Sequence, residues 1–151
     1  MERFIERLTE HHQIGLDTAI FIYHFERNPR YFALTQALLS GIETERWEAI
    51  TSTVTVMEIT VRPWQLNRPE VAQAYEEALT HFPNLTVYDI NRDIAQQAAR
   101  LRARYRVRPA DALQIATAIV RHATAFVTND HQLSRLSPDI EVMVLDEFTV
   151  A

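Results

Sequence analysis

The chain has 151 residues, of which 47% are hydrophobic, and a net charge of −5. These values indicate one globular domain spanning residues 1–151 and exclude a disordered protein. All 15 basic residues are arginine and no cysteine occurs, which excludes disulfides, thiolate metal sites, cysteine nucleophiles and lysine-based catalysis. No apolar run approaches the roughly 18 residues that cross a bilayer, and the charged N-terminus lacks the features of a signal peptide. We therefore expect a cytoplasmic protein with no membrane partner.

The first half of the chain alternates strand and helix patterns after an amphipathic start. Residues 2–12 carry apolar side chains at helical spacing and predict a short N-terminal helical extension. A short buried strand at 13–17 leads to a helix at Thr18–Phe25 and a second helix at 29–41. The β-branched run Ala49–Val54 predicts the next strand.

The second half continues this alternation. A short helix at Val56–Val61 is expected to stop at Pro63, because proline has no N–H group and its ring clashes with the preceding turn. An amphipathic helix follows that includes Val71 and Phe82. The remaining predicted elements are a strand at Leu85–Tyr88, a helix at about 92–105, a nearly all-apolar helix at 109–122, a strand at Ala125–Thr128, a short helix at His131–Leu136 and a strand at Val142–Leu145.

Short apolar strands that alternate with helices indicate an α/β fold with a parallel sheet covered on both faces. Right-handed crossovers place the helix starts at the carboxyl edge of such a sheet. Ligands bind at that edge, where the strand order reverses.

Four acidic residues occupy equivalent places in this pattern. Asp17, Glu58, Asp111 and Asp130 each lie just past a strand-like run or near the start of a helix. If the strands are parallel, all four carboxylates converge on one edge of the sheet. The four motifs contain no evident basic partner, and grouped carboxylates suit a hard divalent cation. The pattern predicts a Mg²⁺- or Mn²⁺-dependent phosphodiesterase site.

Helix capping is the competing explanation for each acid taken alone. Asp17 would cap the helix at Thr18, and Asp130 the helix at His131. The segment Thr55–Glu58 matches a capping box, and Asp111 lies in a first helical turn, where the helix dipole favours a carboxylate. Capping does not require all four acids to share one edge of the sheet, and it is compatible with metal binding.

Four segments resemble the PIN-domain nucleases and, more closely, the VapC-type toxins of type II toxin–antitoxin pairs. They are Ile14–Thr18, Ser52–Glu58, Arg108–Ala118 and Phe126–Asp130, and the resemblance extends from about residue 13 to 148. It implies a three-layer α/β/α fold with a five-stranded parallel sheet of order 3-2-1-4-5. It also implies a homodimer and an antitoxin partner whose tail lies across the acidic groove.

The resemblance assigns roles to particular residues. Asp17, Glu58, Asp111 and the more variable Asp130 would be catalytic and bind the metal. Thr18, Thr128 and Asn129 would support the site. The implied activity is endoribonuclease cleavage of RNA, and the alternative is a PIN-like RNA- or protein-binding module without nuclease activity.

Three further features have two interpretations each. The arginine-rich stretch Arg100–Arg108 is either an RNA-phosphate track or a solvated helix face. The aromatic residues between Tyr23 and Phe32 form either core or a partner surface. His131 adjoins Asp130, but histidine at such a position is more often a surface residue.

Overall fold

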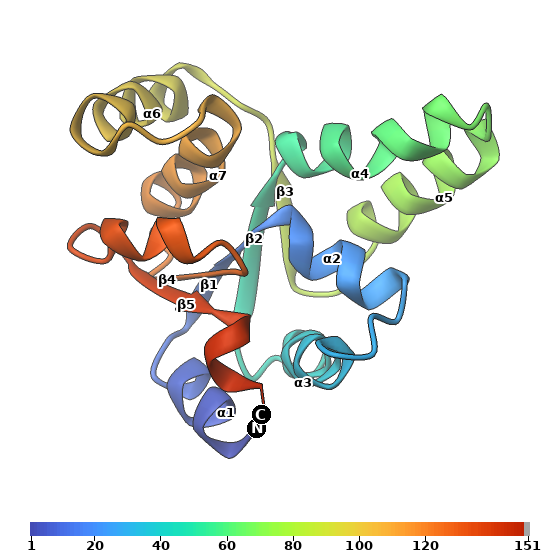
Figure 1. Ribbon diagram of the computed structural model, residues 1–151, viewed down its shortest axis with the longest axis horizontal. Coiled ribbons are helices and arrows are strands. Elements are labelled where there is room, and N and C mark those ends of the chain that lie inside the picture. Colours follow the sequence, from blue (N-terminus) through green and yellow to red (C-terminus); the bar gives the residue numbers. More distant parts are fainter. Residues whose placement is uncertain (150–151) are drawn as a thin grey trace.

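The computed structural model describes residues 1–149 and contains a five-stranded parallel sheet of order β3-β2-β1-β4-β5 (Figure 1). The strands are β1 (Gln13–Leu16), β2 (Glu48–Ser52), β3 (Leu85–Tyr88), β4 (Ala125–Thr128) and β5 (Glu141–Val144). The predicted fold class and strand order are confirmed. Since β1 lies between β2 and β4, the switch point of the sheet is at the end of β1.

Helices cover both faces of the sheet. They are α1 (Glu2–Thr9), α2 (Thr18–Phe25), α3 (Phe32–Glu43), α4 (Thr53–Gln65), α5 (Pro69–Thr80), α6 (Arg92–Tyr105) and α7 (Pro109–Val120), with the 3₁₀ helices η1 (His131–Leu136) and η2 (Leu145–Phe148). One buried cluster joins β1 to α1, α2 and α3, and a second joins the opposite face to α6, α7 and η1. The two clusters separate because successive strand side chains point to opposite faces: Ala125 and Val127 belong to the first, and Phe126 to the second.

Helix α7 lies unusually close to the central strand. A Cβ atom at Gly15 would lie 2.6 Å from the Cβ of Ala118 and 2.9 Å from the Phe126 ring. The missing side chain therefore allows α7 to pack directly on β1. This contact fixes the start of α7 beside the end of β1, where Asp111 and Asp17 lie.

The segment around α4 differs from the prediction. Strand β2 ends at Ser52 rather than at residue 54, because the Ser52 hydroxyl accepts a hydrogen bond from the Val54 N–H at 3.1 Å and begins the helix there. The capping box expected at Thr55 is therefore wrong. The helix also does not stop at Pro63. It continues to Gln65, and Pro63 lies in its last turn, where the missing N–H group removes a single helical bond.

The N-terminal helix is shorter than predicted. It ends at Thr9 and buries Phe4 and Leu8 against the core. The Phe4 ring packs against Phe148, with 5.0 Å between ring centroids, so α1 lies beside η2 (Figure 1). Within residues 1–149, no helix combines the length and the apolar character that crossing a bilayer requires.

Candidate active site

Asp17 lies at the end of the central strand and caps α2. Its Oδ1 accepts a hydrogen bond from the Thr18 N–H at 2.9 Å, and its Oδ2 accepts one from the Thr128 hydroxyl at 2.7 Å. Burial raises the pKa of Asp17 from 3.8 to about 6, the charges of Asp111 and Glu58 add to the rise, and the two hydrogen bonds oppose it. The carboxylate is therefore held by neutral donors in surroundings that disfavour its charge.

Glu58 projects from the second turn of α4 toward the same place. Its Oε1 accepts a hydrogen bond from the Thr18 hydroxyl at 2.7 Å. Thr18 thus contacts two acids, Asp17 through its backbone N–H and Glu58 through its side chain. Because Ser52 caps α4, Glu58 has no capping role.

Asp111 and Asp130 approach from the other side of β1, and a basic residue accompanies them. Arg108 lies 3.2 Å from Asp111 Oδ2 through its Nε and 3.9 Å from Asp130 Oδ2 through its Nη2. The expectation of acids without a basic partner is therefore wrong for this pair. The Arg108 side chain is 79% exposed, so its ion pairs are weakened by water. Asp130 also caps η1 by accepting a hydrogen bond from the Gln132 N–H at 3.0 Å.

All four predicted acids line one open cavity of about 670 Å³, together with Thr18, Thr128 and Asn129. Among residues 1–149, neither Asp17 nor Glu58 forms an ion pair. The structure therefore brings the predicted set together and leaves part of its negative charge without a cation. The ligand atoms that the four acids offer to a metal ion are all carboxylate oxygens, which Mg²⁺ and Mn²⁺ prefer.

A fifth acid at this edge was missed by the sequence analysis. Asp146 follows β5 and accepts hydrogen bonds from Arg30 at 2.7 Å and from the Tyr31 hydroxyl at 2.9 Å, with His131 Nε2 at 3.4 Å. The Tyr31 bond is the main cause of its lowered pKa, and Arg30 adds to it. Its position directly after the last strand is the sequence signal that could have identified it. Unlike Asp17, it is paired with a cation, Arg30.

Asn129 supports the wall of the cavity rather than its acids. Its Nδ2 donates to the Tyr23 hydroxyl at 3.1 Å, and its Oδ1 accepts from the Asp146 N–H at 2.9 Å. Thr18 and Thr128, in contrast, contact the predicted acids directly.

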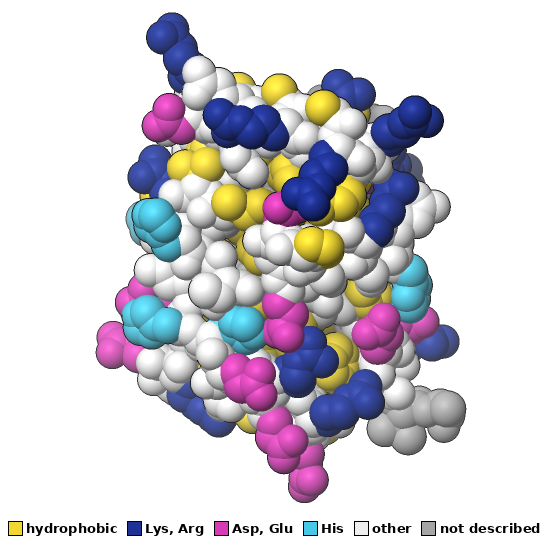
Figure 2. Space-filling view, turned by 90° about the vertical axis from the view of Figure 1, so that its left-hand side faces the viewer, with side chains coloured by type: hydrophobic (Ala, Val, Ile, Leu, Met, Phe, Trp, Pro, Cys, Tyr) yellow, Lys and Arg dark blue, Asp and Glu magenta, His cyan; other side chains and the backbone are white. Residues whose placement is uncertain are grey.

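A smaller basic pocket adjoins the acidic cavity. It encloses about 290 Å³ and shares Arg108, Asp111 and Asp130 with the cavity, while Arg106 and Arg135 complete its basic lining. Neither Arg106 nor Arg135 forms an ion pair within the described part of the chain. Figure 2 shows arginine side chains gathered over the upper part of the face on which α6 lies, with acidic and histidine side chains below them.

The stretch Arg100–Arg108 is not a continuous track. Arg100 bonds Gln97, Arg102 bonds the Val107 carbonyl and Arg104 pairs with Asp139. Only the end of the stretch, at Arg106 and Arg108, lines the pocket beside the acids.

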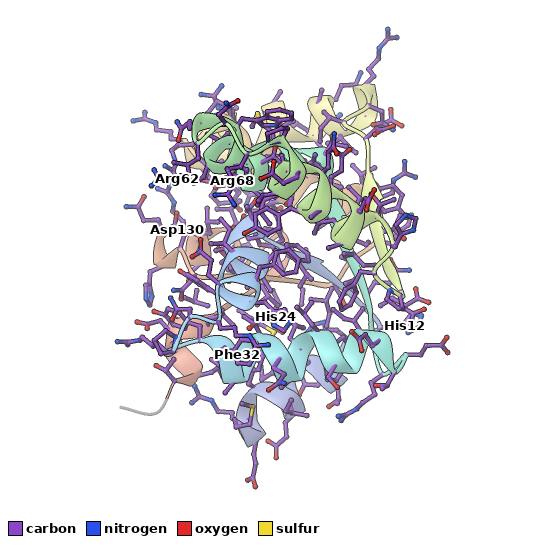
Figure 3. All side chains as sticks on the ribbon, turned by 90° about the vertical axis from the view of Figure 1, so that its right-hand side faces the viewer. His12, His24, Phe32, Arg62, Arg68 and Asp130 are labelled. Carbon is purple, nitrogen blue, oxygen red and sulfur yellow. The ribbon has the colours of Figure 1, made fainter. Side chains whose placement is uncertain are left out.

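The aromatic residues after β1 are stacked in pairs and partly buried. His24 stacks on Phe32 with 5.1 Å between ring centroids (Figure 3), and Tyr23 stacks on Tyr31 at 4.6 Å. The large apolar side chains that are exposed lie elsewhere. Apart from Met1, those identified in residues 1–149 are Met57, Val61, Trp64 and Leu66, on α4 and at its end.

A groove lies beside these exposed side chains. It encloses about 410 Å³ between α2, α4 and α5, and its apolar lining includes Phe25, Ile59 and Tyr75. Arg62 and Arg68 also line it, and Figure 3 shows them on the same side of the molecule as Asp130. Glu58 borders both this groove and the acidic cavity, so the two adjoin.

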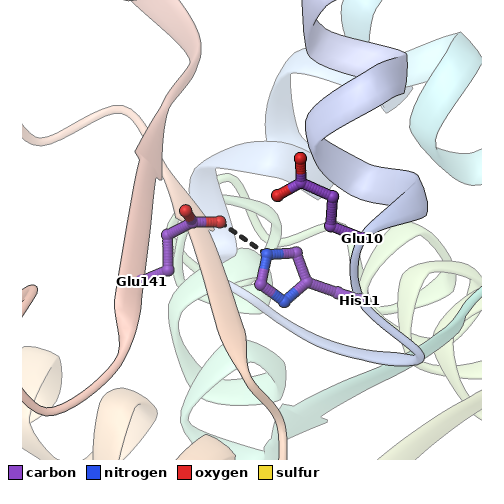
Figure 4. A group of neighbouring side chains, drawn as sticks. All are labelled: Glu10, His11 and Glu141. Atoms are coloured by element: carbon purple, nitrogen blue, oxygen red, sulfur yellow. Dashed lines mark hydrogen bonds and ion pairs between the residues drawn. The ribbon is translucent and has the colours of Figure 1, made fainter.

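A second cluster of metal-type side chains lies at the opposite, amino-terminal edge of the sheet. Glu10, His11 and Glu141 bring ligand atoms within 4.8 Å of one another (Figure 4). Glu141 already pairs with His11 at 2.5 Å and with Arg7 at 2.9 Å, and the other His11 nitrogen lies 2.7 Å from the Thr124 hydroxyl. These contacts pair Glu141 and His11 and connect the segment after α1 to β5.

Comparison with known proteins places this geometry in a family. The family model described as the PIN domain matches residues 14–137. No curated protein matches the chain. Among solved structures, VapBC2 from Rickettsia felis, bound to a DNA fragment from their promoter, has a TM-score of 0.67 at 18% identity, covering 87% of this chain and 98% of that one. A toxin–antitoxin complex from Klebsiella pneumoniae has a TM-score of 0.66 at 22% identity, covering 88% of this chain and 97% of that one. VapBC-5 from Mycobacterium tuberculosis has a TM-score of 0.58 at 20% identity, covering 88% of this chain and 98% of that one. At these identities the similarity establishes a shared fold.

Proposed function

The chain belongs to the PIN domain family, and on that premise we propose that it is a divalent-metal-dependent endoribonuclease that hydrolyses RNA phosphodiester bonds in the cytoplasm. We propose further that it is the toxin of a toxin–antitoxin pair, and that residues 1–151 form one domain with α1 as an extension. The observation that carries the proposal is Asp17, which lies partly buried with three other acids around one cavity and has no cationic partner among residues 1–149.

The residues around the cavity fit a hard divalent cation. Asp17, Glu58, Asp111 and Asp130 would hold Mg²⁺ or Mn²⁺, because bringing these acids together in a partly dry site is unfavourable without a compensating positive charge. When bound, such an ion polarises a phosphate group and lowers the pKa of an attacking water.

The chain's own residues have three tasks in this proposal. Thr18 and Thr128 orient the carboxylates of Glu58 and Asp17 by donating hydrogen bonds to them. Arg106, Arg108 and Arg135 would bind RNA phosphates beside the acids, which allows a protein of net charge −5 to hold a polyanion locally. No side chain forms a covalent intermediate.

Two features support protein partners. The solved structures of the same fold include toxin–antitoxin complexes, and we propose an antitoxin whose basic side chain enters the acidic cavity. The exposed apolar side chains Met57, Val61 and Trp64 on α4 support a protein interface, and we propose that the toxin is a homodimer.

Cleavage of total RNA by Asp17→Asn, with and without millimolar Mg²⁺ or Mn²⁺, tests the activity. We expect cleavage by the wild type only with metal, and a loss of more than about 100-fold in the variant, since removing even an indirect support of a metal ligand costs about 10- to 100-fold. Asp146→Asn is the matched control, because this acid lies at the same edge but is paired with Arg30 and Tyr31. It should retain cleavage.

Equal cleavage by wild type and Asp17→Asn would defeat the nuclease proposal. The competing function is a PIN-like RNA- or protein-binding module. It would show no change in melting temperature on addition of Mg²⁺ or Mn²⁺, whereas a metal site gains stability with its ligand.

A further inference from the structure

A buried hydrogen-bond network lies directly beneath the acidic cavity, with Gln114 at its centre. The side chain of Gln114 projects from α7 and is 3% exposed. Its Oε1 accepts from the Ser52 hydroxyl at 2.7 Å, and its Nε2 donates to Thr55 at 2.7 Å and to Thr18 at 3.1 Å. One amide thus joins α7 to the start of α4 and the start of α2.

The direction of each bond in this network follows from counting hydrogens. Thr51 donates its single hydroxyl hydrogen to the Leu16 carbonyl, which is only an acceptor. At the 2.8 Å contact between Thr51 and Thr55, the hydrogen must therefore come from Thr55. With its own hydrogen used, Thr55 accepts from Gln114, and this requirement orients the amide with its nitrogen toward Thr55 and Thr18.

The amide orientation then determines what Thr18 does. The Thr18 oxygen accepts from Gln114, and its one hydrogen has two acceptors within reach, Glu58 Oε1 at 2.7 Å and the Thr55 hydroxyl at 3.1 Å. Because Thr55 already accepts from Gln114, the Thr18 hydrogen goes to Glu58. A second acceptor in place of the Gln114 nitrogen would compete with Glu58 for that hydrogen. The two hydrogens of the Gln114 nitrogen go to Thr55 and Thr18. The network therefore directs the Thr18 hydrogen to Glu58, one of the four predicted acids.

We infer that Gln114 is a positioning residue for the metal site: through Thr18 it holds Glu58 in the orientation that binds the cation. Gln114 lies beneath the cavity and is not one of the residues that line it, whereas Thr18 is. The inference rests on the proposed function, since the role of Glu58 as a metal ligand is part of it.

A Mn²⁺ titration followed by melting temperature tests the inference without relying on activity. In Gln114→Met, which keeps the size of the side chain but removes its donors, the half-saturating Mn²⁺ concentration should rise about tenfold. Thr117→Val is the matched control. Thr117 is buried on the same helix and its hydroxyl bonds only the Leu113 carbonyl, so its loss should leave Mn²⁺ affinity unchanged.

A double-mutant cycle separates positioning from general stability. If Gln114 acts through Thr18, Gln114→Met should add nothing to the affinity loss of Thr18→Val. If Gln114→Met lowered Mn²⁺ affinity as much in Thr18→Val as it does in the wild type, the inference would be overturned. Wild-type Mn²⁺ affinity in Gln114→Met would overturn it too. Should Gln114→Met not fold, Gln114→Glu preserves the shape and offers at most one hydrogen, and the same rise is expected.

Failure of the inference and failure of the proposed function are distinguishable. A wild-type protein without any response to Mn²⁺ would reject the metal site. A crystal structure of metal-free Gln114→Met decides the inference in either case: we expect the Thr18 hydroxyl to turn away from Glu58, and an unchanged bond between them would overturn it.

Discussion

The two edges of the sheet both gather acidic side chains, but Glu141 at one edge is paired with a cation and Asp17 at the other is not. At the amino edge, Glu141 is paired with Arg7 and His11. At the carboxyl edge, Asp17 is held by a hydroxyl and an N–H group, and burial raises its pKa to about 6. The ligand atoms of Glu10, His11 and Glu141 lie within 4.8 Å of one another, whereas the carboxyl-edge group is distinguished by the unpaired charge of Asp17. The comparison teaches that charge balance, more than the spacing of ligand atoms, distinguishes the candidate active site from the cluster at the amino edge.

The largest expected effect concerns the pH dependence of metal-free stability. Because the folded-state pKa of Asp17 is raised from 3.8 to about 6, the folded state favours its protonated form. Its contribution to stability is fully present below pH 3.8 and is lost as the pH rises through 6. At about 1.4 kcal/mol per pKa unit, the loss is about 3 kcal/mol.

Urea denaturation in EDTA between pH 3.5 and about 7.5 measures this loss. The difference in unfolding free energy between Asp17→Asn and the wild type should grow by about 3 kcal/mol across this range. If unfolding free energy changed with pH in the same way in both proteins, the surroundings would not disfavour the ionised form of Asp17. The contrast between the two edges would then disappear.

Thr128→Val removes the hydroxyl that donates to Asp17, at a position that is fully buried. Mn²⁺ affinity and RNA cleavage should each fall about 10- to 100-fold, as for other groups that orient metal ligands. The pKa of Asp17 should rise further, since this bond lowers it. A metal titration by calorimetry measures the affinity, and a change of less than twofold would contradict the assigned role.

His11→Ala tests the amino edge. Loss of the bonds to Glu141 and Thr124 should reduce the unfolding free energy by about 1 kcal/mol. Metal-dependent stabilisation and cleavage should remain at wild-type values, because the cluster lies at the opposite edge of the sheet from the acidic cavity. A reduced response to Mn²⁺ or Zn²⁺ in this variant would instead make the amino edge a metal site.

The smallest expected effect on stability is that of Arg108→Gln. Its ion pairs with Asp111 and Asp130 are exposed, so the unfolding free energy should change by less than about 0.5 kcal/mol. RNA binding should weaken, with KM rising more than kcat falls, because the arginine lines the cavity and the adjoining basic pocket. A lower kcat at unchanged KM would assign Arg108 to the reaction itself.

The alternation of strands and helices predicted a parallel sheet with the four acids at one edge, and the resemblance to the PIN-domain nucleases supplied the strand order. Asp17 and Asp111 could be placed on the correct edge, since parallel strands with right-handed crossovers leave no other arrangement. The sequence could not show that Arg108 turns back onto Asp111, because that depends on the path of the chain between α6 and α7.

The errors around α4 have a physical cause. The run from Thr53 to Val56 is rich in β-branched residues, which local propensity assigns to a strand. Burial of Val54 and Thr55 against neighbouring elements overrides that propensity, and Ser52 supplies the cap. The network of Gln114 also escaped prediction, because its partners come from two segments far from it in the sequence, at Thr18 and at Ser52–Thr55.

The glycine beneath α7 has a consequence for the whole cavity. Gly15 lies two residues before Asp17, and the helix that rests on it carries both Asp111 and Gln114. Any larger residue at position 15 would meet Ala118 at 2.6 Å and push the helix outward. Gly15 therefore determines how far apart β1 and α7 hold their carboxylates, although it has no side chain and lies in the core outside the cavity.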